Sequence, residues 1–274
     1  MCGIVGYIGK SQAQGIMTSG LRRLEYRGYD SAGIVTLDET GKDTLIRVKG
    51  KVSQLDGLVS QEPRQDKIGI GHTRWATHGR PSTANAHPHQ AGDIFLVHNG
   101  IIENFKELKE HLSDHTFTSE TDSEVLAALI NSFYIGSTSL FDAVSQALKL
   151  VVGTYGIAVV SKRQPDEIIV ARLGSPLIIG VGQNENLIAS DASALLGYTD
   201  QAIYLKDGEL AKITKDSVDI FDLAAQPINA RVETIETDLA AIQKQGYKHF
   251  LLKEIMEQPT TLRSTLSGRI DTEH

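Results

Sequence analysis

A succession of short apolar strands in the third quarter of the chain constrains its fold more than any other feature. The strands are rich in β-branched residues and are separated by turns such as Lys206-Asp207-Gly208, so that neighbours can pair through hairpins. They are predicted at Tyr155–Val160, Ile168–Arg172, Leu177–Gly180, Leu187–Ser190, Ala202–Leu205 and Glu209–Ile213. Antiparallel pairing is therefore the natural arrangement of this part of the chain.

Further strands and several helices are predicted in the first half of the chain. Apolar, β-branched runs predict strands at Gly3–Gly9, Gly33–Leu37, Leu45–Val48, Ile68–His72 and Ile94–His98. Apolar residues at helical spacing predict helices at Gln14–Tyr26, Phe105–Leu112, Asp122–Phe133 and Leu140–Leu150. Between Thr73 and Gly92 lies a loop of about twenty residues, and a loop of that length inside a compact domain is usually functional or disordered.

Charge and hydropathy exclude several classes of partner. The chain has 27 Lys and Arg against 34 Asp and Glu, a net charge of −7, which argues against a nucleic acid as the principal partner. No apolar run approaches the roughly 18 residues that span a membrane, and the N-terminus lacks the features of a secretory signal. We therefore expect a cytoplasmic enzyme that acts on a small molecule, with no membrane partner.

The single cysteine, Cys2, directly follows the initiator Met1. One thiol excludes an internal disulfide and a multi-cysteine zinc site. An isolated cysteine is commonly a small buried hydrophobic residue. At position 2, however, removal of Met1 leaves the thiol beside a free α-amine, whose unperturbed pKa of about 7.7–8.0 suits a general base. The sequence therefore predicts an N-terminal nucleophile at the start of a buried strand.

The long loop opens with a segment that is rich in polar and aromatic side chains. Gly71–Gly79 contains the only tryptophan, an arginine, two histidines and two threonines. Arginine can hold a carboxylate through two parallel hydrogen bonds, and threonine hydroxyls can complete that clamp. A solvated turn with Trp75 over the edge of the core is the alternative. His87 and His89 add imidazoles and raise the alternative of a metal site together with His72, His78 and His98. The histidines lack the helical spacing of familiar zinc sites, so no metal is expected.

Two shorter motifs follow the loop. The side-chain amide of Asn99 and the backbone N–H of Gly100 are the components of an oxyanion hole, although an Asn-Gly turn is common. Further along, Thr121 and Glu124 predict a capping box at the start of a helix. Asp122 can instead bind an α-ammonium group. The pattern favours the capping interpretation, and the two are compatible.

A charged and aromatic segment, Glu25–Gly33, precedes the second predicted strand. An ion pair between Arg27 and Asp30 is the simplest arrangement for its charges. A lid over a binding site and a polar turn are the alternatives. The pattern alone does not decide among them.

After Pro227 the character of the chain changes. Residues 228–245 are polar and resemble a connector, and Lys248–Leu266 predicts an amphipathic helix interrupted by Pro259. Such a helix can dock onto another chain or a further domain, or fold back onto its own sheet. We divide the chain into a catalytic domain at residues 2–227 and a linker with its helix at residues 228–274.

Taken together, the motifs resemble a known family. The segments that carry the resemblance are Cys2–Gly6, Tyr26–Gly33, Gly71–Gly79, Asn85–His89, Val97–Asn104 and Ser119–Asp122. In order and content they are similar to the glutaminase domain of the glucosamine-6-phosphate synthases, the isomerising glutamine:fructose-6-phosphate aminotransferases. These are class II, N-terminal-nucleophile amidotransferases. The resemblance covers the whole chain and implies an α+β fold, a four-layer αββα sandwich of two antiparallel sheets.

The resemblance also implies a role for each matching residue. Cys2 would be the nucleophile and its own amine the base, and Asn99 with Gly100 would form the oxyanion hole. The remaining residues would bind or enclose glutamine: Arg74 and Thr77 at the α-carboxylate, Asp122 with Gly100 at the α-ammonium, His78 in the covering loop, Trp75 on the ammonia path, and His87 supporting the pocket. No cofactor and no metal are implied.

The implied reaction is hydrolysis of the side-chain amide of L-glutamine through a γ-glutamyl thioester. In the family the ammonia then aminates fructose-6-phosphate at two sugar-isomerase modules beyond the linker, and the full-length enzyme is expected to be a homo-oligomer. This chain ends at His274, before such modules, so we expect it to be part of a longer protein. Retention of Met1 would acylate the amine and leave the site inactive.

Three other functions stay open at this point. An N-terminal-cysteine hydrolase of other acylated amines would share Cys2 but not an arginine clamp for a carboxylate. A binding module would sense glutamine with Met1 retained. A metal hydrolase would use the histidines of the long loop.

Overall fold

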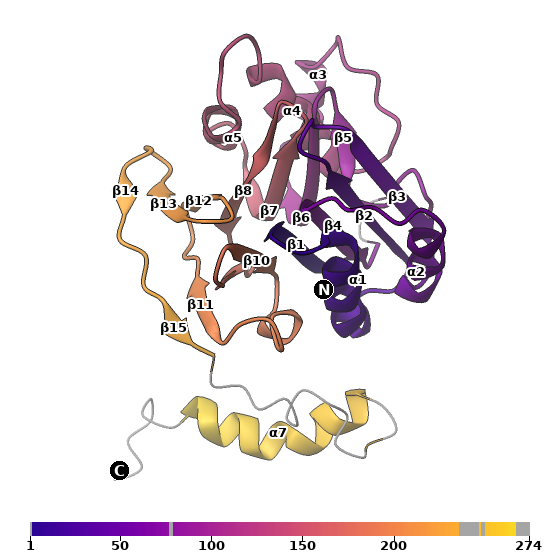
Figure 1. Ribbon diagram of the computed structural model, residues 1–274, viewed down its shortest axis with the longest axis vertical. Coiled ribbons are helices and arrows are strands. Elements are labelled where there is room, and N and C mark those ends of the chain that lie inside the picture. Colours follow the sequence, from indigo (N-terminus) through magenta and orange to yellow (C-terminus); the bar gives the residue numbers. More distant parts are fainter. Residues whose placement is uncertain (1, 77–78, 236–246, 248–249, 267–274) are drawn as a thin grey trace. The chain divides into compact units, whose positions relative to one another are not determined.

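The computed structural model describes residues 2–76, 79–235, 247 and 250–266 (Figure 1). The chain divides into two units, Met1–Ile235 and Glu236–His274. The second unit contains helix α7 (Phe250–Leu266). Among the described residues, no helix has both the length and the apolar character needed to cross a membrane.

Two antiparallel sheets form the centre of the first unit. In sheet order, the eight-stranded sheet consists of β15 (Glu233–Thr234), β11 (Gln201–Tyr204), β9 (Ile178–Val181), β10 (Glu185–Ala189), β1 (Gly3–Gly9), β4 (Ile68–Arg74), β2 (Ser31–Leu37) and β3 (Asp43–Lys49). The seven-stranded sheet consists of β14 (Pro227–Ile228), β13 (Val218–Asp222), β12 (Glu209–Ile213), β8 (Gln164–Leu173), β7 (Gly153–Ser161), β6 (Ile94–Ile102) and β5 (His89–Ala91). The predicted antiparallel pairing is confirmed, and β7 with β8 and β9 with β10 form hairpins. The turn Lys206-Asp207-Gly208 does not close a hairpin, because it leads from β11 in one sheet to β12 in the other.

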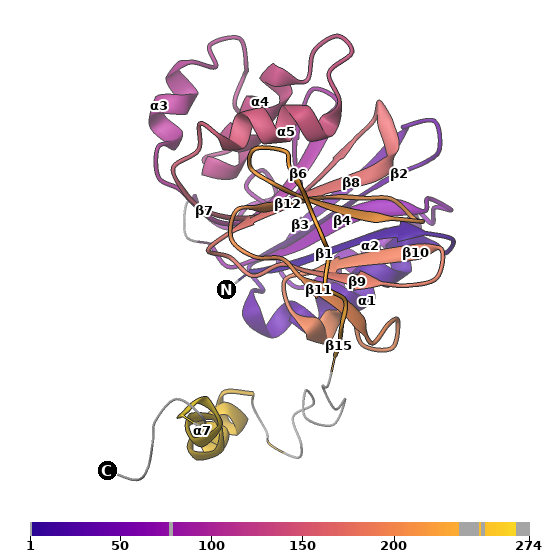
Figure 2. The same cartoon turned by 90° about the vertical axis from the view of Figure 1, so that its left-hand side faces the viewer.

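Helices cover the outer face of each sheet (Figure 2). Helices α1 (Ala13–Leu24) and α2 (Val52–Gln61) pack on the eight-stranded sheet. Helices α3 (Phe105–Glu110), α4 (Asp122–Phe133) and α5 (Leu140–Leu148) pack on the seven-stranded sheet. Two short 3₁₀ helices lie at Glu25–Arg27 and Ala192–Ala194. The four-layer αββα sandwich expected from the resemblance is therefore confirmed.

The interior between the two sheets explains why the central strands have apolar residues at nearly every position. In β1, Ile4 and Ile8 face the opposite sheet, whereas Val5 and Tyr7 face the helices. Side chains alternate along a strand, so a strand buried on both faces needs apolar groups in both sets. Each fully buried aliphatic side chain contributes about 1.5–3 kcal/mol relative to exposure.

The structure differs from the sequence-based expectations in two helices and several strands. The sequence does not predict β13 or α2, although Val52, Leu55 and Val59 of α2 are buried at helical spacing. Strand β5 lies in the segment predicted as a long loop, and β14 and β15 lie at the predicted start of the connector. The expected break at Pro259 is wrong, because α7 continues through this residue. An interior proline costs a helix about 3 kcal/mol but does not by itself end it.

The strand predicted at Ile94–His98 is longer in the structure and continues through the Asn-Gly motif. Strand β6 continues to Ile102, and its pairing with β7 extends through Gly100↔Tyr155 to Ile102↔Gly153. Gly100 has a φ of +135°, a conformation that side-chain-bearing residues rarely adopt. The glycine therefore distorts the strand locally without ending the ladder.

The first unit continues past Pro227. Strand β14 pairs with β13, strand β15 pairs with β11, and the backbone N–H of Ile235 donates to the carbonyl of Asp200 at 2.7 Å. These contacts keep residues up to Ile235 in the sandwich. The functional division of the chain at Pro227 stays a prediction.

Helix α4 begins with only half of the predicted capping box. The hydroxyl of Thr121 accepts a hydrogen bond from the backbone N–H of Glu124 at 3.3 Å. The Glu124 carboxylate is 2% exposed and accepts instead from the backbone N–H groups of Thr118 at 2.8 Å and Ser119 at 2.6 Å. Burial alone would raise the pKa of Glu124, but these hydrogen bonds from Ser119 and Thr118 hold it below its ordinary value of 4.5.

Substitution Glu124→Gln should lower the free energy of unfolding at neutral pH by about 1–3 kcal/mol, because the amide nitrogen would face backbone donors in a buried position. Since the folded-state pKa lies below the unfolded value of 4.5, the contribution of the carboxylate is complete above that pH and is lost as the pH falls through the folded-state pKa. Urea unfolding of both proteins between about pH 7 and pH 3 measures the difference. A difference that stays constant over this range would contradict the assignment.

Candidate active site

Cys2 directly precedes β1. This strand lies in the middle of the eight-stranded sheet, between β10 and β4. Its Sγ accepts a hydrogen bond from the backbone N–H of Trp75 at 3.2 Å. The next residue must be small, because a Cβ on Gly3 would lie 2.7 Å from both Leu24 Cβ and Thr73 Oγ1. The glycine thus allows the Cys2 backbone to lie close to β4 and α1.

The electrostatic environment leaves the Cys2 thiol protonated at neutral pH. Burial raises the pKa of the thiol above its ordinary value, and the Trp75 N–H and the positive charge of Arg74 oppose this shift only in part. A thiol becomes a nucleophile only as the thiolate. Reactivity at Cys2 therefore requires a base that removes the proton.

Asn99 reaches Cys2 from the opposite sheet. Its Nδ2 donates to the carbonyl oxygen of Cys2 at 3.1 Å, and its Oδ1 lies 2.9 Å from His72 Nε2. A carbonyl oxygen can only accept a hydrogen bond, so the amide nitrogen is the atom that faces the cysteine. The two sheets therefore meet at Cys2, with a side-chain donor next to it.

A small cavity of about 30 Å³ lies beside Cys2. It is lined by six of the residues singled out in the sequence, namely Cys2, Arg74, Trp75, His87, Gly100 and Asp122, together with His72, His98, Thr121 and Ser123. The volume is about that of one water molecule. A larger ligand therefore needs the lining side chains to move. Thr77 and His78 lie outside the described residues.

Two opposite charges border this cavity. Arg74, at the end of β4, is 5% exposed and donates through Nη2 to the carbonyl of Gly79 at 3.3 Å. Asp122, the first residue of α4, is also 5% exposed, and its Oδ2 accepts from the backbone N–H of Ile102 at 2.9 Å. A guanidinium and a carboxylate around one small space suit a zwitterionic amino acid.

Four buried histidines cluster at this site, and three of them, His72, His87 and His98, line the cavity. The His72 and His87 rings stack with centroids 4.2 Å apart, and His89 meets His87 edge-on at 4.6 Å. Burial lowers the pKa of His72 and of His89 to about 3, and lowers those of His87 and His98 as well. The imidazoles are therefore neutral at physiological pH. Among the described residues, no three His, Cys, Asp or Glu side chains are grouped as metal ligands.

The segment before β2 holds the backbone at Arg74–Ala76, next to Cys2, in place. It does not do so through the expected ion pair. Arg27 pairs with Asp191 and not with Asp30. The Asp30 carboxylate instead accepts a hydrogen bond from the backbone N–H of Ala76. The backbone N–H of Asp30 donates to the carbonyl of Arg74 at 3.1 Å. Asp30 thereby fixes the backbone on both sides of the residue that contacts the Cys2 thiol.

Trp75 does not cover the edge of the core. Its side chain is 50% exposed and meets the ring of Tyr29 at a centroid distance of 5.8 Å. Because its backbone N–H contacts Cys2 while its ring is half in solvent, Trp75 stands at the mouth of the cavity. The alternative of a solvated turn with Trp75 on the core is therefore wrong.

Three residues of this site, His72, His98 and Ser123, receive no catalytic or glutamine-binding role from the sequence. His98 lines the cavity, and its Nδ1 lies 2.9 Å from the hydroxyl of Ser123, which lines it too. The sequence signal that could have identified His98 and Ser123 is their position next to proposed site residues. His98 directly precedes Asn99, and Ser123 directly follows Asp122. The pairing of these neighbours depends on the packing of α4 against β6 and is not visible in either motif alone.

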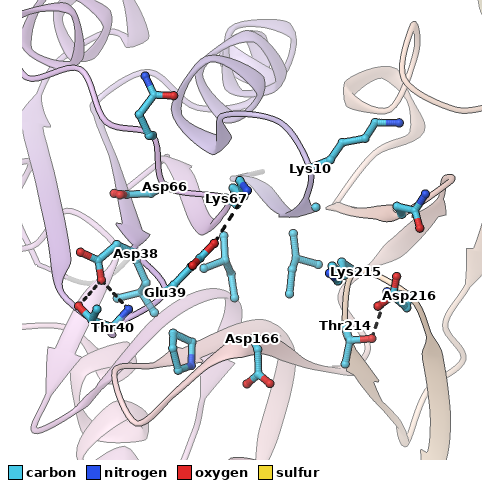
Figure 3. A pocket seen from close by; sticks show the side chains of 17 residues that line it. Lys10, Asp38, Glu39, Thr40, Asp66, Lys67, Asp166, Thr214, Lys215 and Asp216 are labelled. Carbon is cyan, nitrogen blue, oxygen red and sulfur yellow. Dashed lines mark hydrogen bonds and ion pairs between the residues drawn. The ribbon is translucent and has the colours of Figure 1, made fainter.

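A larger cavity of about 1040 Å³ lies at the other end of β1, around Gly9 and Lys10 (Figure 3). Its described lining contains neither cysteine nor histidine. Several of its charges are already engaged, since Lys67 pairs with Glu39 at 3.9 Å and Asp38 accepts from Thr40 Oγ1 at 2.6 Å. The smaller cavity at Cys2 is therefore the candidate active site.

Comparison with known proteins agrees with this geometry. The model of the family described as glutamine amidotransferase domain matches residues 56–249. Enzymes named glutamine–fructose-6-phosphate aminotransferase (isomerizing) are 46% identical over 279 residues in Bacteroides thetaiotaomicron and 48% identical over 282 residues in Chlorobaculum tepidum. Both alignments include 100% of this chain but only 45% and 46% of the relatives, so the chain spans about half their length.

A solved structure gives the same result at the level of the fold. The glutamine phosphoribosylpyrophosphate amidotransferase from B. subtilis, complexed with ADP and GMP, superposes with a TM-score of 0.68 at 29% identity. The superposition covers 82% of this chain and 50% of that one. Since the family model matches most of the chain and the fold agrees, the chain belongs to the glutamine amidotransferase domain family.

Proposed function

We propose that this chain is the glutaminase half of an isomerising glutamine–fructose-6-phosphate aminotransferase. The observation that carries the proposal is the contact between the Asn99 amide nitrogen and the Cys2 carbonyl oxygen, at 3.1 Å, next to a cavity that Cys2, Arg74 and Asp122 line. One sheet supplies a nucleophile and the other a hydrogen-bond donor beside it. The two charges match the α-carboxylate and α-ammonium groups of L-glutamine.

The proposed reaction begins once Met1 has been removed. The α-amine of Cys2 takes the thiol proton, which the raised pKa of the thiol makes necessary at neutral pH. The thiolate then attacks the side-chain amide carbon of glutamine. The Asn99 amide and the Gly100 N–H hold the developing oxyanion, as preorganised donors in a site with little water.

Release of ammonia and hydrolysis complete the cycle. The protonated amine passes its proton to the departing nitrogen, and the γ-glutamyl thioester on Cys2 remains. Water, activated by the same amine, then attacks the thioester and yields glutamate with the free thiol. No step needs a metal or a cofactor.

The remaining roles follow the same proposal. Arg74 and Thr77 bind the α-carboxylate, Asp122 binds the α-ammonium, His78 belongs to the covering loop, Trp75 stands on the ammonia path and His87 supports the pocket. Residues 2–227 are the catalytic domain, and residues 228–274 lead to the rest of a longer, cytoplasmic and homo-oligomeric protein. There the ammonia aminates fructose-6-phosphate.

Substitution Cys2→Ala should abolish glutamate formation from glutamine, by at least about 10³-fold, because it removes the nucleophile. The mass of the purified wild-type protein should show that Met1 is absent. A glutamate-release assay and a thermal unfolding curve of both proteins give the comparison. Activity that survives in the folded alanine variant would refute the proposed function, and so would an active protein that retains Met1.

Substitution Asn99→Ala should lower kcat about 10²- to 10³-fold, equivalent to about 2.7–4 kcal/mol of transition-state stabilisation. The KM for glutamine should change little, because the lost interaction is made with the oxyanion and not with the ground-state amide. Steady-state kinetics of glutamate release separate the two constants. A raised KM at unchanged kcat would assign Asn99 to substrate binding instead.

Substitution Arg74→Gln should raise the KM for glutamine about 10- to 100-fold, because a charged hydrogen bond to the α-carboxylate is lost. Asp122→Asn should have a similar effect through the α-ammonium. Truncated substrates provide the matched control: 4-aminobutanamide lacks the carboxylate and should be insensitive to the Arg74 change, whereas 5-amino-5-oxopentanoate lacks the ammonium and should be insensitive to the Asp122 change. Equal sensitivity of both truncated substrates to both variants would contradict the assignment and favour a different acylated amine as substrate.

A further inference from the structure

His72 lies between the proposed oxyanion donor and the histidine cluster. It is on β4, is 1% exposed, and its Nε2 lies 2.9 Å from Asn99 Oδ1. Its ring stacks on His87 at a centroid distance of 4.2 Å and an interplanar angle of 22°. His72 lines the cavity with Cys2, yet neither the proposed reaction nor the motif analysis gives it a role.

The hydrogen bonds around His72 fix the position of its proton. The Cys2 carbonyl accepts from Asn99 Nδ2, so the Asn99 oxygen is the atom that faces His72. That oxygen can only accept, and therefore His72 Nε2 carries the hydrogen. Among the described residues, Nδ1 of His72 has no hydrogen-bond partner. An imidazole protonated at Nε2 alone fits this arrangement, since a buried N–H without a partner at Nδ1 would be costly.

The stacked neighbour keeps the same protonation pattern. His87 Nδ1 accepts a hydrogen bond from the backbone N–H of His98 at 3.2 Å, so it carries no proton. Both stacked rings are buried and neutral, and they do not repel one another. The His87 ring therefore supports the His72 ring in place, while the backbone of β6 sets the orientation of His87.

The Asn99 amide has two orientations related by a half-turn of its terminal group, and only one points its nitrogen at Cys2. The flipped form would bring the amide oxygen against the Cys2 carbonyl oxygen and the amide nitrogen against the His72 N–H. The first contact would then join two hydrogen-bond acceptors and the second two donors, so that neither hydrogen bond could form. With a donor at His72 Nε2, the productive orientation is held from both ends.

We propose that His72 is a positioning residue that locks the Asn99 amide with its nitrogen toward Cys2, so that the oxyanion donor is in place before the thiolate attacks. This inference rests on the proposed glutaminase function. In this proposal His72 acts through its hydrogen bond to Asn99 and makes no hydrogen bond to the substrate. Its loss should therefore affect the transition state and leave glutamine binding largely unchanged.

A matched pair of variants isolates the hydrogen bond. In His72→Gln, the amide nitrogen stands as many bonds from the backbone as Nε2 does, so a donor remains. In His72→Met, the side chain has the same length and lacks the donor. Both variants lose the ring stacking on His87 equally. Any difference between them therefore measures the hydrogen bond to Asn99.

Glutaminase kinetics are the first readout, on the full chain with Met1 removed. His72→Met should lower kcat about 10- to 100-fold with KM within about twofold, whereas His72→Gln should lose no more than about threefold in kcat. L-Glutamate γ-semialdehyde, which adds the Cys2 thiol to form a thiohemiacetal with its own oxyanion, should lose affinity for the Met variant by a similar factor. L-Glutamate binding and the rate of Cys2 alkylation by iodoacetamide, which form no oxyanion, should stay the same.

The outcomes separate this inference from a structural role and from the proposed function. Equal losses in the two variants, or a change in KM instead of kcat, would overturn it. Long-range proton–nitrogen NMR spectra of the wild type should show that the His72 ring is protonated at Nε2. Protonation at Nδ1 instead would overturn the inference, and this measurement does not depend on the folding of the two variants. A wild type without glutaminase activity would refute the proposed function as well, whereas an active wild type with an equally active Met variant would refute the inference alone.

Discussion

The hydrogen bond from the Asn99 amide to the Cys2 carbonyl joins the two sheets at the end where the N-terminus enters the fold. Cys2 leads into β1 of one sheet, and Asn99 is part of β6 in the other. Their separation is set by the interior between the sheets, which includes Ile4, Phe95 and Val97. Protein interiors are close-packed and resist compression, so this packing fixes the distance between Cys2 and the Asn99 amide. A site built on strands is also held more rigidly than one built on loops.

The electrostatics of the site depend on which groups are neutral. The imidazoles of His72 and His87, which line the cavity, are buried and uncharged, and the Cys2 thiol is protonated. Arg74 and Asp122 are then the permanent charges among the described lining residues, and they bear opposite signs. A zwitterion is stabilised there, whereas a simple anion or cation meets one unfavourable partner. The larger cavity at the other end of β1 has charges of both signs, of which Lys67 and Glu39 form an ion pair.

The parts of the structure that could be predicted are those that depend on residues close together in the sequence. Helix α4 begins and ends at the predicted residues, because its capping residue and apolar periodicity are local signals. The strand predicted at Ile94–His98 is longer in the structure because pairing with β7, far along the chain, overrides the local turn signal of the Asn-Gly motif. The bond from His72 to Asn99 crosses between the sheets, and no spacing in the sequence encodes it. The roles of Arg74 and Asp122 came from the resemblance, and pattern alone favoured capping at the latter.

The position of Trp75 makes it useful as a spectroscopic probe, whatever reaction takes place at Cys2. It is the only tryptophan of the chain, it is half exposed, and its backbone N–H donates to the Cys2 thiol. Tryptophan fluorescence excited selectively therefore originates at a single place, the rim of the candidate active site. Acylation of the thiol, closure of the cavity or loss of the N–H contact each changes the surroundings of that indole. The protein thus contains an intrinsic optical reporter next to the Cys2 thiol, and stopped-flow emission can follow events at this thiol without any attached label.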